Sequence, residues 1–144
     1  MYISKSISNF EILDEISLIK RCNCSNCQFE SMFINFEYGG NNYVIAGVYR
    51  HPKGNTSHFT SALEEALDKC ESKRTIFYCA DSNIDLIKFD TSHVEIFVNM
   101  MLSRRFLPHI TLPTRITESS ATCIDHIFIR HPTNNVSPHT VHSI

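Results

Sequence analysis

The sequence predicts a single α/β domain. Short apolar, strand-like runs alternate along the chain with two amphipathic helical patterns, and 144 residues suit one domain with a real core but not two. Hydrophobic residues make up 42% of the chain and charged residues 19%, which is typical of a globular protein. The formal net charge of −2 provides no general basic field, which counts mildly against DNA binding by this chain alone.

The clearest predicted element is a β-hairpin. Apolar and polar residues alternate over Met32–Tyr38, the residues Gly39 to Asn42 predict a turn, and Tyr43–Tyr49 is apolar on both faces, as in a central strand. The chain before this hairpin is expected to form an edge strand, then a segment ambiguous between a short helix and two strands, then a polar loop, over residues 1–7, 9–20 and 21–28.

Two helices are predicted from apolar residues at helical spacing. Thr56 or Ser57 can cap the first helix, and Ser92 with Glu95 forms a capping box for the second. The expected inner face of the first helix is Phe59, Leu63, Ala66, Leu67 and Cys70. The expected inner face of the second helix is Val94, Phe97, Val98, Met101 and Leu102.

Between the helices, the apolar strand Thr75–Ala80 runs into Asp81, Asn83 and Asp85. Because side chains two apart on an extended chain share a face, these three could project together from the end of a buried strand. Carboxylate and carboxamide oxygens suit a hard cation such as Mg²⁺. The spacing begins like a calcium-binding EF-hand loop but lacks that loop's later Gly and Glu, which excludes it. A turn whose side chains bond their own backbone remains the alternative.

The last predicted strand, Cys123–Arg130, carries Asp125 among apolar residues on one face. A lone carboxylate there is costly unless it is paired. It either accepts hydrogen bonds from a neighbouring turn or shares a site with Asp81, and the second acidic strand end favours the shared site. His126 points to the other face and is interpreted as a packed core histidine rather than a ligand.

The six cysteines are expected to be reduced thiols of an intracellular protein, nuclear or cytoplasmic and not secreted, because we find no signal peptide and no apolar run long enough for a membrane span. Cys22, Cys24 and Cys27 form the only cluster. Cys24 and Cys27 supply one half of a structural zinc site, but no second pair follows. Zinc is therefore not expected, and a small thiol-zinc interaction module stays open only as an alternative.

Four motifs taken together resemble one family. They are Tyr49-Arg50-His51-Pro52, Ala80 to Leu86, Pro113-Thr114-Arg115 and Thr122 to Ile127. In order and spacing they are similar to the endonuclease/exonuclease/phosphatase family, in the form that non-LTR (LINE-like) retrotransposons carry ahead of their reverse transcriptase. The resemblance covers nearly the whole chain and is weakest at both ends.

The resemblance implies a four-layer α/β/β/α sandwich that cuts DNA phosphodiesters with Mg²⁺ or Mn²⁺, and a reverse transcriptase domain in the parent polypeptide. It implies that Asp81 activates or orients the attacking water, that Asn83 holds the scissile phosphate, and that Asp125 supports a histidine or metal arrangement. Asp81 and Asn83 are the implied metal residues. The implied contacts to the DNA backbone come from Tyr49, Arg115 and Thr122.

The chain also departs from the family pattern. An early Asn and a metal-binding Glu would precede Met1, and a closing Ser-Asp-His motif would follow Ile144. Ala80 and Ser82 stand where the family has Gly and an aromatic residue. We therefore expect residues 1–144 to be a single incomplete domain with part of the sandwich and with impaired or no nuclease activity. A non-catalytic remnant is the alternative.

Overall fold

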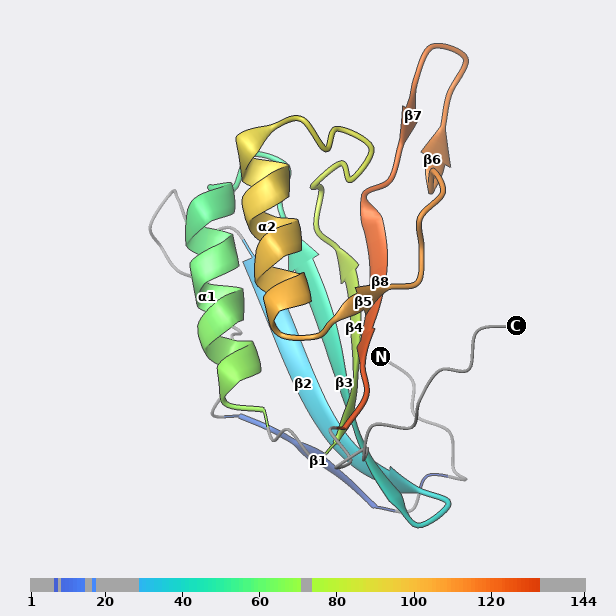
Figure 1. The fold of residues 1–144 in the computed structure, drawn as a ribbon. Coiled ribbons are helices and arrows are strands. Elements are labelled where there is room, and N and C mark those ends of the chain that lie inside the picture. Colours follow the sequence, from blue (N-terminus) through green and yellow to red (C-terminus); the bar gives the residue numbers. More distant parts are fainter. Residues whose placement is uncertain (1–6, 8, 15–16, 18–28, 71–73, 133–144) are drawn as a thin grey trace, which may run out of the picture.

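The computed structural model describes residues 7, 9–14, 17, 29–70 and 74–132. They form a six-stranded mixed sheet in the order β1-β2-β3-β4-β8-β5, with both helices on one face (Figure 1). The sheet strands are β1 (Phe10–Ile12), β2 (Phe29–Tyr38), β3 (Asn41–Arg50), β4 (Thr75–Asp81), β5 (Leu107–Pro108) and β8 (Asp125–Arg130). The helices are α1 (Thr56–Asp68) and α2 (Ser92–Ser103), and a separate hairpin consists of β6 (Arg115–Ile116) and β7 (Ala121–Thr122).

The predicted hairpin is confirmed as β2 and β3. Its turn is shorter than expected, because only Gly39 (φ 58°) and Gly40 (φ 76°) leave the strands, and their positive φ angles match the two-residue turn that suits the twist of a hairpin. The ambiguous segment before β2 contains the short edge strand β1, antiparallel to β2. The predicted strand at residues 1–7 and the loop at 21–28 lie outside the described residues, except for Ile7, which is not in a strand.

Both helices lie where the periodicity predicts them, but their caps differ. The carboxamide oxygen of Asn55 accepts a hydrogen bond from the backbone N–H of His58 at 2.9 Å, so Asn55 caps α1 in place of Thr56 or Ser57. The N-cap of α2 is Thr91, and the predicted capping box at Ser92 is wrong. The hydroxyl of Thr91 donates instead to the Lys88 carbonyl at 2.8 Å. Among the described residues, no helix is long and apolar enough to cross a bilayer.

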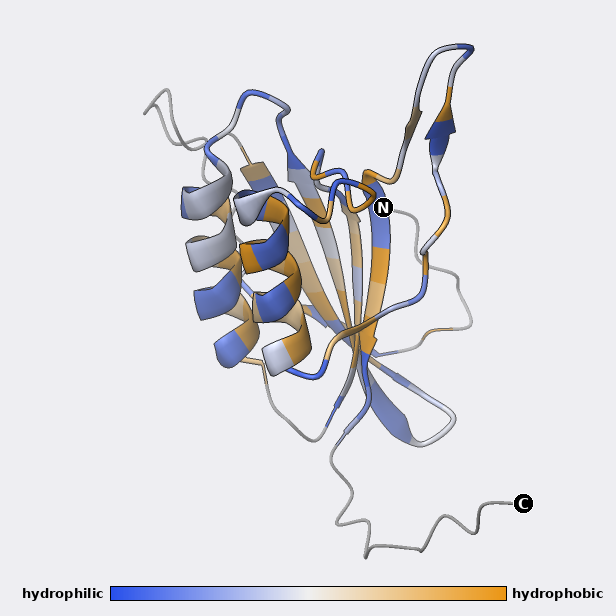
Figure 2. Cartoon of the chain, turned by 45° about the horizontal axis from the view of Figure 1, so that its top comes forward, coloured by the Kyte–Doolittle hydropathy of each residue, from blue (hydrophilic) through white to orange (hydrophobic). Residues whose placement is uncertain are grey.

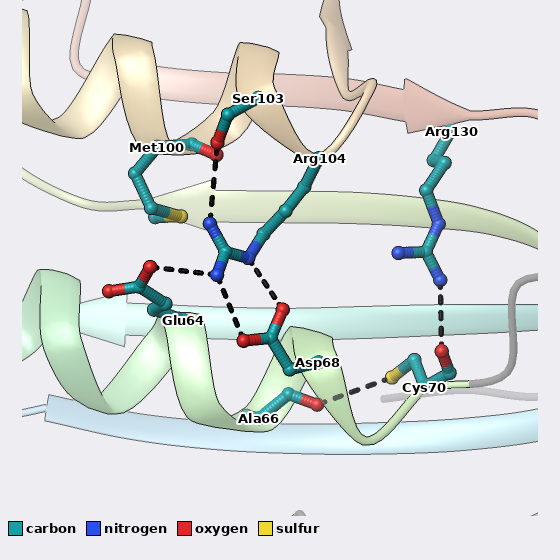
Figure 3. Close-up of polar contacts among 8 residues, drawn as sticks. All are labelled: Glu64, Ala66, Asp68, Cys70, Met100, Ser103, Arg104 and Arg130. Atoms are coloured by element: carbon teal, nitrogen blue, oxygen red, sulfur yellow. Dashed lines mark hydrogen bonds and ion pairs between the residues drawn. The ribbon is translucent and has the colours of Figure 1, made fainter.

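Arg104 joins the two helices at the end of α2 (Figure 3). Its Nε and Nη2 donate to the two carboxylate oxygens of Asp68 at 2.7 and 2.9 Å, and Nη2 also lies 2.7 Å from Glu64. The pKa of the Asp68 carboxyl is lowered, mainly by the hydrogen bond from Arg104. Both carboxylates are well exposed, so this pair orients α1 against α2 more than it stabilises the fold.

The core lies between the helices and the sheet. Figure 2 shows hydrophobic residues on the sides of α1 and α2 that face the strands. On α2 one prediction is wrong: Leu102 is 43% exposed, whereas Met100 is buried. The opposite face of the sheet is also apolar, with partly buried side chains such as Met32, Ile45, Phe77 and Ile127, and no described helix covers it.

Tyr78 points from β4 into this core. It is fully buried, and its ring packs edge-on against Phe128 at 6.0 Å between centroids. Its hydroxyl oxygen has no hydrogen-bond partner among the described residues, and burial raises the pKa of the phenol far above its usual range. The hydroxyl therefore loses its hydration without compensation.

We expect Tyr78→Phe to raise the free energy of unfolding by about 1 kcal/mol, because it removes an unsatisfied buried hydroxyl and keeps the ring. Urea unfolding followed by circular dichroism measures the change. Phe77→Leu, on the other face of the same strand, is the control for altering an aromatic residue of β4. A loss of stability in Tyr78→Phe would mean that the hydroxyl has a partner.

Candidate active site

A row of three polar side chains crosses three adjacent strands at one end of the sheet. Asp81, the last residue of β4, stands directly opposite Asp125, the first residue of β8, in the antiparallel ladder. Tyr49 near the end of β3 stands beside Asp81 in the parallel ladder. All three lie on the sheet face away from the helices; both carboxylates are partly buried and Tyr49 is 43% exposed.

Two carboxylates placed directly across a strand pair repel each other, so the pair is unfavourable unless a cation or a donor lies between them. One oxygen of Asp81, Oδ1, is buried and has no hydrogen-bond partner among the described residues. A dehydrated, unpaired carboxylate oxygen is a natural ligand for a hard cation. Within the described part of the chain, however, no three His, Cys, Asp or Glu side chains lie close enough together to hold a metal ion.

Asn83 lies in the turn just beyond Asp81, with its backbone in the left-handed region at φ 51°. Asparagine tolerates this conformation better than most residues, but it still costs on the order of 1 kcal/mol. The Asn83 Nδ2 donates to the backbone carbonyl of Arg50 at 2.7 Å. Because a carbonyl only accepts, the amide orientation is determined, and Oδ1 has no hydrogen bond from the described residues.

The side chain of Arg50 holds this turn from the helix side of the sheet. It is 3% exposed, and its Nε donates to the Ser82 carbonyl at 2.6 Å while Nη2 donates to the Asn83 carbonyl at 2.9 Å. Its Nη1 donates to the Gly54 carbonyl at 2.6 Å, in the loop after β3. Burial lowers the pKa of Arg50, and nearby Tyr78 and Asp81 oppose that shift. An arginine remains protonated even so.

Ser82 and His126 form a buried polar pair behind the acidic row. The Nε2 of His126 lies 3.1 Å from the Cys123 carbonyl, which can only accept, so Nε2 carries the proton. Nδ1 then accepts from the Ser82 hydroxyl at 3.0 Å, and that hydroxyl oxygen accepts in turn from the N–H of Ile84 at 3.3 Å. Burial lowers the pKa of His126. The structure places His126 in the core, as its position on the strand predicts.

Asp85 does not join the row, contrary to the expectation that it projects with Asp81 and Asn83. Its Oδ1 accepts from the backbone N–H of Cys123 at 2.9 Å and of Ile87 at 3.3 Å. The second bond is the local turn interaction that the alternative reading of this motif described. The first bond ties the loop after β4 to the segment before β8, so Asp85 has a structural role.

Arg115 and Thr122 lie apart from the acidic row, opposite each other in the β6–β7 hairpin. Figure 1 shows this hairpin projecting beyond the end of the sheet where β4 ends and β8 begins. At its base, the hydroxyl of Thr114 accepts from the backbone N–H groups of Ile124 and Asp125 at 3.3 and 3.2 Å. The hairpin is thereby anchored next to Asp125.

Sequence reasoning found the acidic pair but not the residues that support it. Arg50, Ser82 and Thr114 all lie inside the motifs quoted for the family resemblance, yet their partners are distant in the chain. Ser82, between Asp81 and Asn83, therefore gave no local signal of its pairing with His126, which is 44 residues away. The cysteines Cys22, Cys24 and Cys27 of the alternative zinc module lie outside the described residues.

Comparison with known proteins gives a fold. No protein-family profile and no curated protein sequence matches the chain. Among solved structures, it is similar to the endonuclease domain of TRAS1, a telomere-specific non-LTR retrotransposon, with a TM-score of 0.57 and 13% identity over 68% of this chain and 49% of that one. It is also similar to an endonuclease/exonuclease/phosphatase family protein from Leptotrichia buccalis, with a TM-score of 0.52 and 14% identity over 86% and 50% of the two chains.

A third similar structure is TDP2 from D. rerio in complex with a single-strand DNA product, with a TM-score of 0.51 and 11% identity over 88% of this chain and 54% of that one. The chain has the endonuclease/exonuclease/phosphatase fold. The predicted fold class is therefore confirmed, and the described residues form one six-stranded sheet and one helix layer of it, together with the separate β6–β7 hairpin. The chain spans about half the length of these three structures.

Proposed function

We propose that this chain carries part of a divalent-metal-dependent phosphodiesterase centre of the DNA endonuclease type. The row of Tyr49, Asp81 and Asp125 carries the proposal, because it places two facing carboxylates at the rim of a fold shared with the TRAS1 endonuclease domain. We further propose that residues 1–144 form one incomplete domain, and that the parent polypeptide includes a reverse transcriptase domain.

The chemistry of the donor set fits Mg²⁺ or Mn²⁺. Asp81 would hold the ion through its buried, unpaired Oδ1, with Asp125 opposite and the free Oδ1 of Asn83 as a weaker ligand. Bound there, the ion would neutralise charge on a phosphodiester and favour a water-derived nucleophile. Because the described residues supply only this sparse oxygen set, most of the coordination shell would be water.

The side chains take distinct roles in this proposal. Asp81 orients a water molecule and accepts its proton, and Asp125 opposite it supports the binding of the metal ion. Tyr49, with its ring half exposed, donates a hydrogen bond from its phenolic hydroxyl to a non-bridging phosphate oxygen. Asn83 contacts the scissile phosphate or its metal ion. Arg115 and Thr122 on the projecting hairpin bind the DNA backbone beside the site.

Mn²⁺ binding tests the acidic row without requiring catalysis. We expect substoichiometric Mn²⁺ to broaden the backbone NMR signals of Asp81, Asn83 and Asp125 before any others, and Asp125→Asn to abolish this localised effect. Without metal, Asp125→Asn should raise the free energy of unfolding by about 0.5 kcal/mol, because it removes a like-charge pair across two strands. Asp68→Asn, far from the row, is the matched control. Broadening spread evenly over all the carboxylates would overturn the proposed site.

Nicking of supercoiled plasmid tests completeness. We expect no Mg²⁺-dependent nicking by the isolated chain above an Asp81→Ala control, because two carboxylates and one carboxamide lack most of the transition-state stabilisation that phosphodiester cleavage needs. Robust nicking that Asp81→Ala abolishes would show an active enzyme and would overturn the inferred loss of activity. Nicking that persists in Asp81→Ala would come from a contaminating nuclease.

A further inference from the structure

Arg50 has an arrangement that core packing alone does not require. A buried guanidinium usually pairs with a carboxylate, but the hydrogen bonds of Arg50 go to backbone carbonyls, those of Ser82, Asn83, Gly54 and, at 3.3 Å, His51. Two of these carbonyls belong to the turn that directly follows Asp81. The loop after β3 and the loop after β4 are therefore fastened to the same planar group.

Arg50 also contacts Asn83 through its own backbone. Its carbonyl accepts from the Asn83 Nδ2 at 2.7 Å, while its Nη2 donates to the Asn83 carbonyl at 2.9 Å. Arg50 and Asn83 thus hold each other through both the side chain and the main chain of each residue. These two hydrogen bonds offset the conformational cost of the left-handed Asn83 backbone. They use Nδ2 and the main-chain carbonyl of Asn83, so Oδ1 receives no hydrogen bond from the described residues.

We propose that Arg50 is a positioning residue of the candidate site: it fixes the turn at residues 82–83, directly after Asp81, and holds the Asn83 carboxamide by Nδ2 so that Oδ1 is left for a ligand. The inference rests on the function proposed above, because that function supplies the metal ion or phosphate that the Asn83 Oδ1 would bind. The planar fork of arginine is needed, since lysine offers a single point of charge and cannot reach carbonyls on two loops in fixed geometry.

Arg50→Lys tests this role while keeping the positive charge next to Asp81. We expect the apparent Kd for Mn²⁺, measured from the broadening of the Asp81 and Asp125 signals, to rise about tenfold, which is typical when a residue that orients a ligand is lost. The side-chain amide signals of Asn83 should move toward the positions of a solvent-exposed asparagine.

Arg130→Lys is the matched control. Arg130 is also a partly buried arginine on the helix side, and it donates to the Cys70 carbonyl at 3.2 Å (Figure 3). Its guanidinium also lies over the Phe106 ring, 5.0 Å from the centroid. It stands at the opposite end of the β4–β8 ladder from the acidic pair. Arg130→Lys should therefore disturb stability but leave the Mn²⁺ Kd within about twofold of the unsubstituted chain. Equal weakening of Mn²⁺ binding in both variants would reflect general destabilisation and would overturn the positioning role.

Two further outcomes separate this inference from the proposed function. If the unsubstituted chain binds no Mn²⁺ at the acidic row, the proposed function fails, while the Asn83 amide signals in Arg50→Lys still test the positioning. If Arg50→Lys does not fold, Asn83→Gly replaces it, because glycine adopts a positive φ without strain. Protection of the Arg50 Nε proton from exchange should persist in Asn83→Gly if Arg50 organises the turn. Loss of that protection would overturn the proposal.

Discussion

Replacing Phe97 with alanine should lower the free energy of unfolding by about 3–5 kcal/mol, as is typical when a fully buried phenylalanine is truncated. Phe97 lies on the inner face of α2 and is 0% exposed. Its ring meets Phe59 of α1 at 6.2 Å and two β8 residues, His126 and Phe128, at 5.8 and 6.0 Å. It therefore joins both helices to the strand that carries Asp125.

The size of this effect follows from where the cavity would open. Truncation removes transfer free energy and leaves a void between two helices and a sheet, which cannot close by moving one side chain. Urea unfolding followed by circular dichroism measures the loss. Phe97→Leu should cost less, because the larger residue fills part of the void, and it serves if the alanine variant does not fold.

Ile96→Ala provides the control on the same helix, since Ile96 is 57% exposed and should change stability by less than about 0.5 kcal/mol. A loss of less than about 1.5 kcal/mol in Phe97→Ala would mean that α2 packs more loosely against the sheet than its buried ring implies.

Much of the fold could be predicted because it depends on local pattern. Alternation and a Gly-Gly turn locate β2 and β3, and helical spacing locates α1 and α2. Caps were predicted less well because several polar residues precede each helix and compete for the same N–H groups. Asn55 caps α1, and the Thr91 hydroxyl bonds a carbonyl in the preceding turn instead.

In the candidate site, too, the features that depend on local pattern could be predicted and those that depend on distant contacts could not. The meeting of Asp81 and Asp125 could be predicted because Asp81 ends a strand and Asp125 is a lone carboxylate on an apolar strand face, and the ladder makes them partners. The position of the Asp85 side chain depends on a hydrogen bond from the backbone N–H of Cys123, 38 residues away, which no local pattern reveals. The same holds for Arg50 and Asn83, 33 residues apart, so the support of the turn emerged only from the three-dimensional arrangement.

Acid should destabilise the folded chain through His126. Burial lowers its pKa in the folded state, so the unfolded chain binds more protons as the pH falls below the ordinary histidine value of about 6.5. Stability is therefore fully present above that value and is lost as the pH falls toward the lower folded-state pKa. One proton contributes a slope of at most about 1.4 kcal/mol per pH unit.

Protonation would also act on the site. A doubly protonated His126 can no longer accept from the Ser82 hydroxyl at Nδ1. The hydrogen bond that joins β8 to the 82–83 turn must therefore break or reverse its direction. Because the same turn carries Asn83, acid should loosen the carboxamide before the whole chain unfolds. Urea unfolding from pH 8 to 5, compared with His126→Gln, isolates the contribution, and the Asn83 side-chain amide signals report the turn. An unchanged pH slope in His126→Gln would assign the acid sensitivity to other groups.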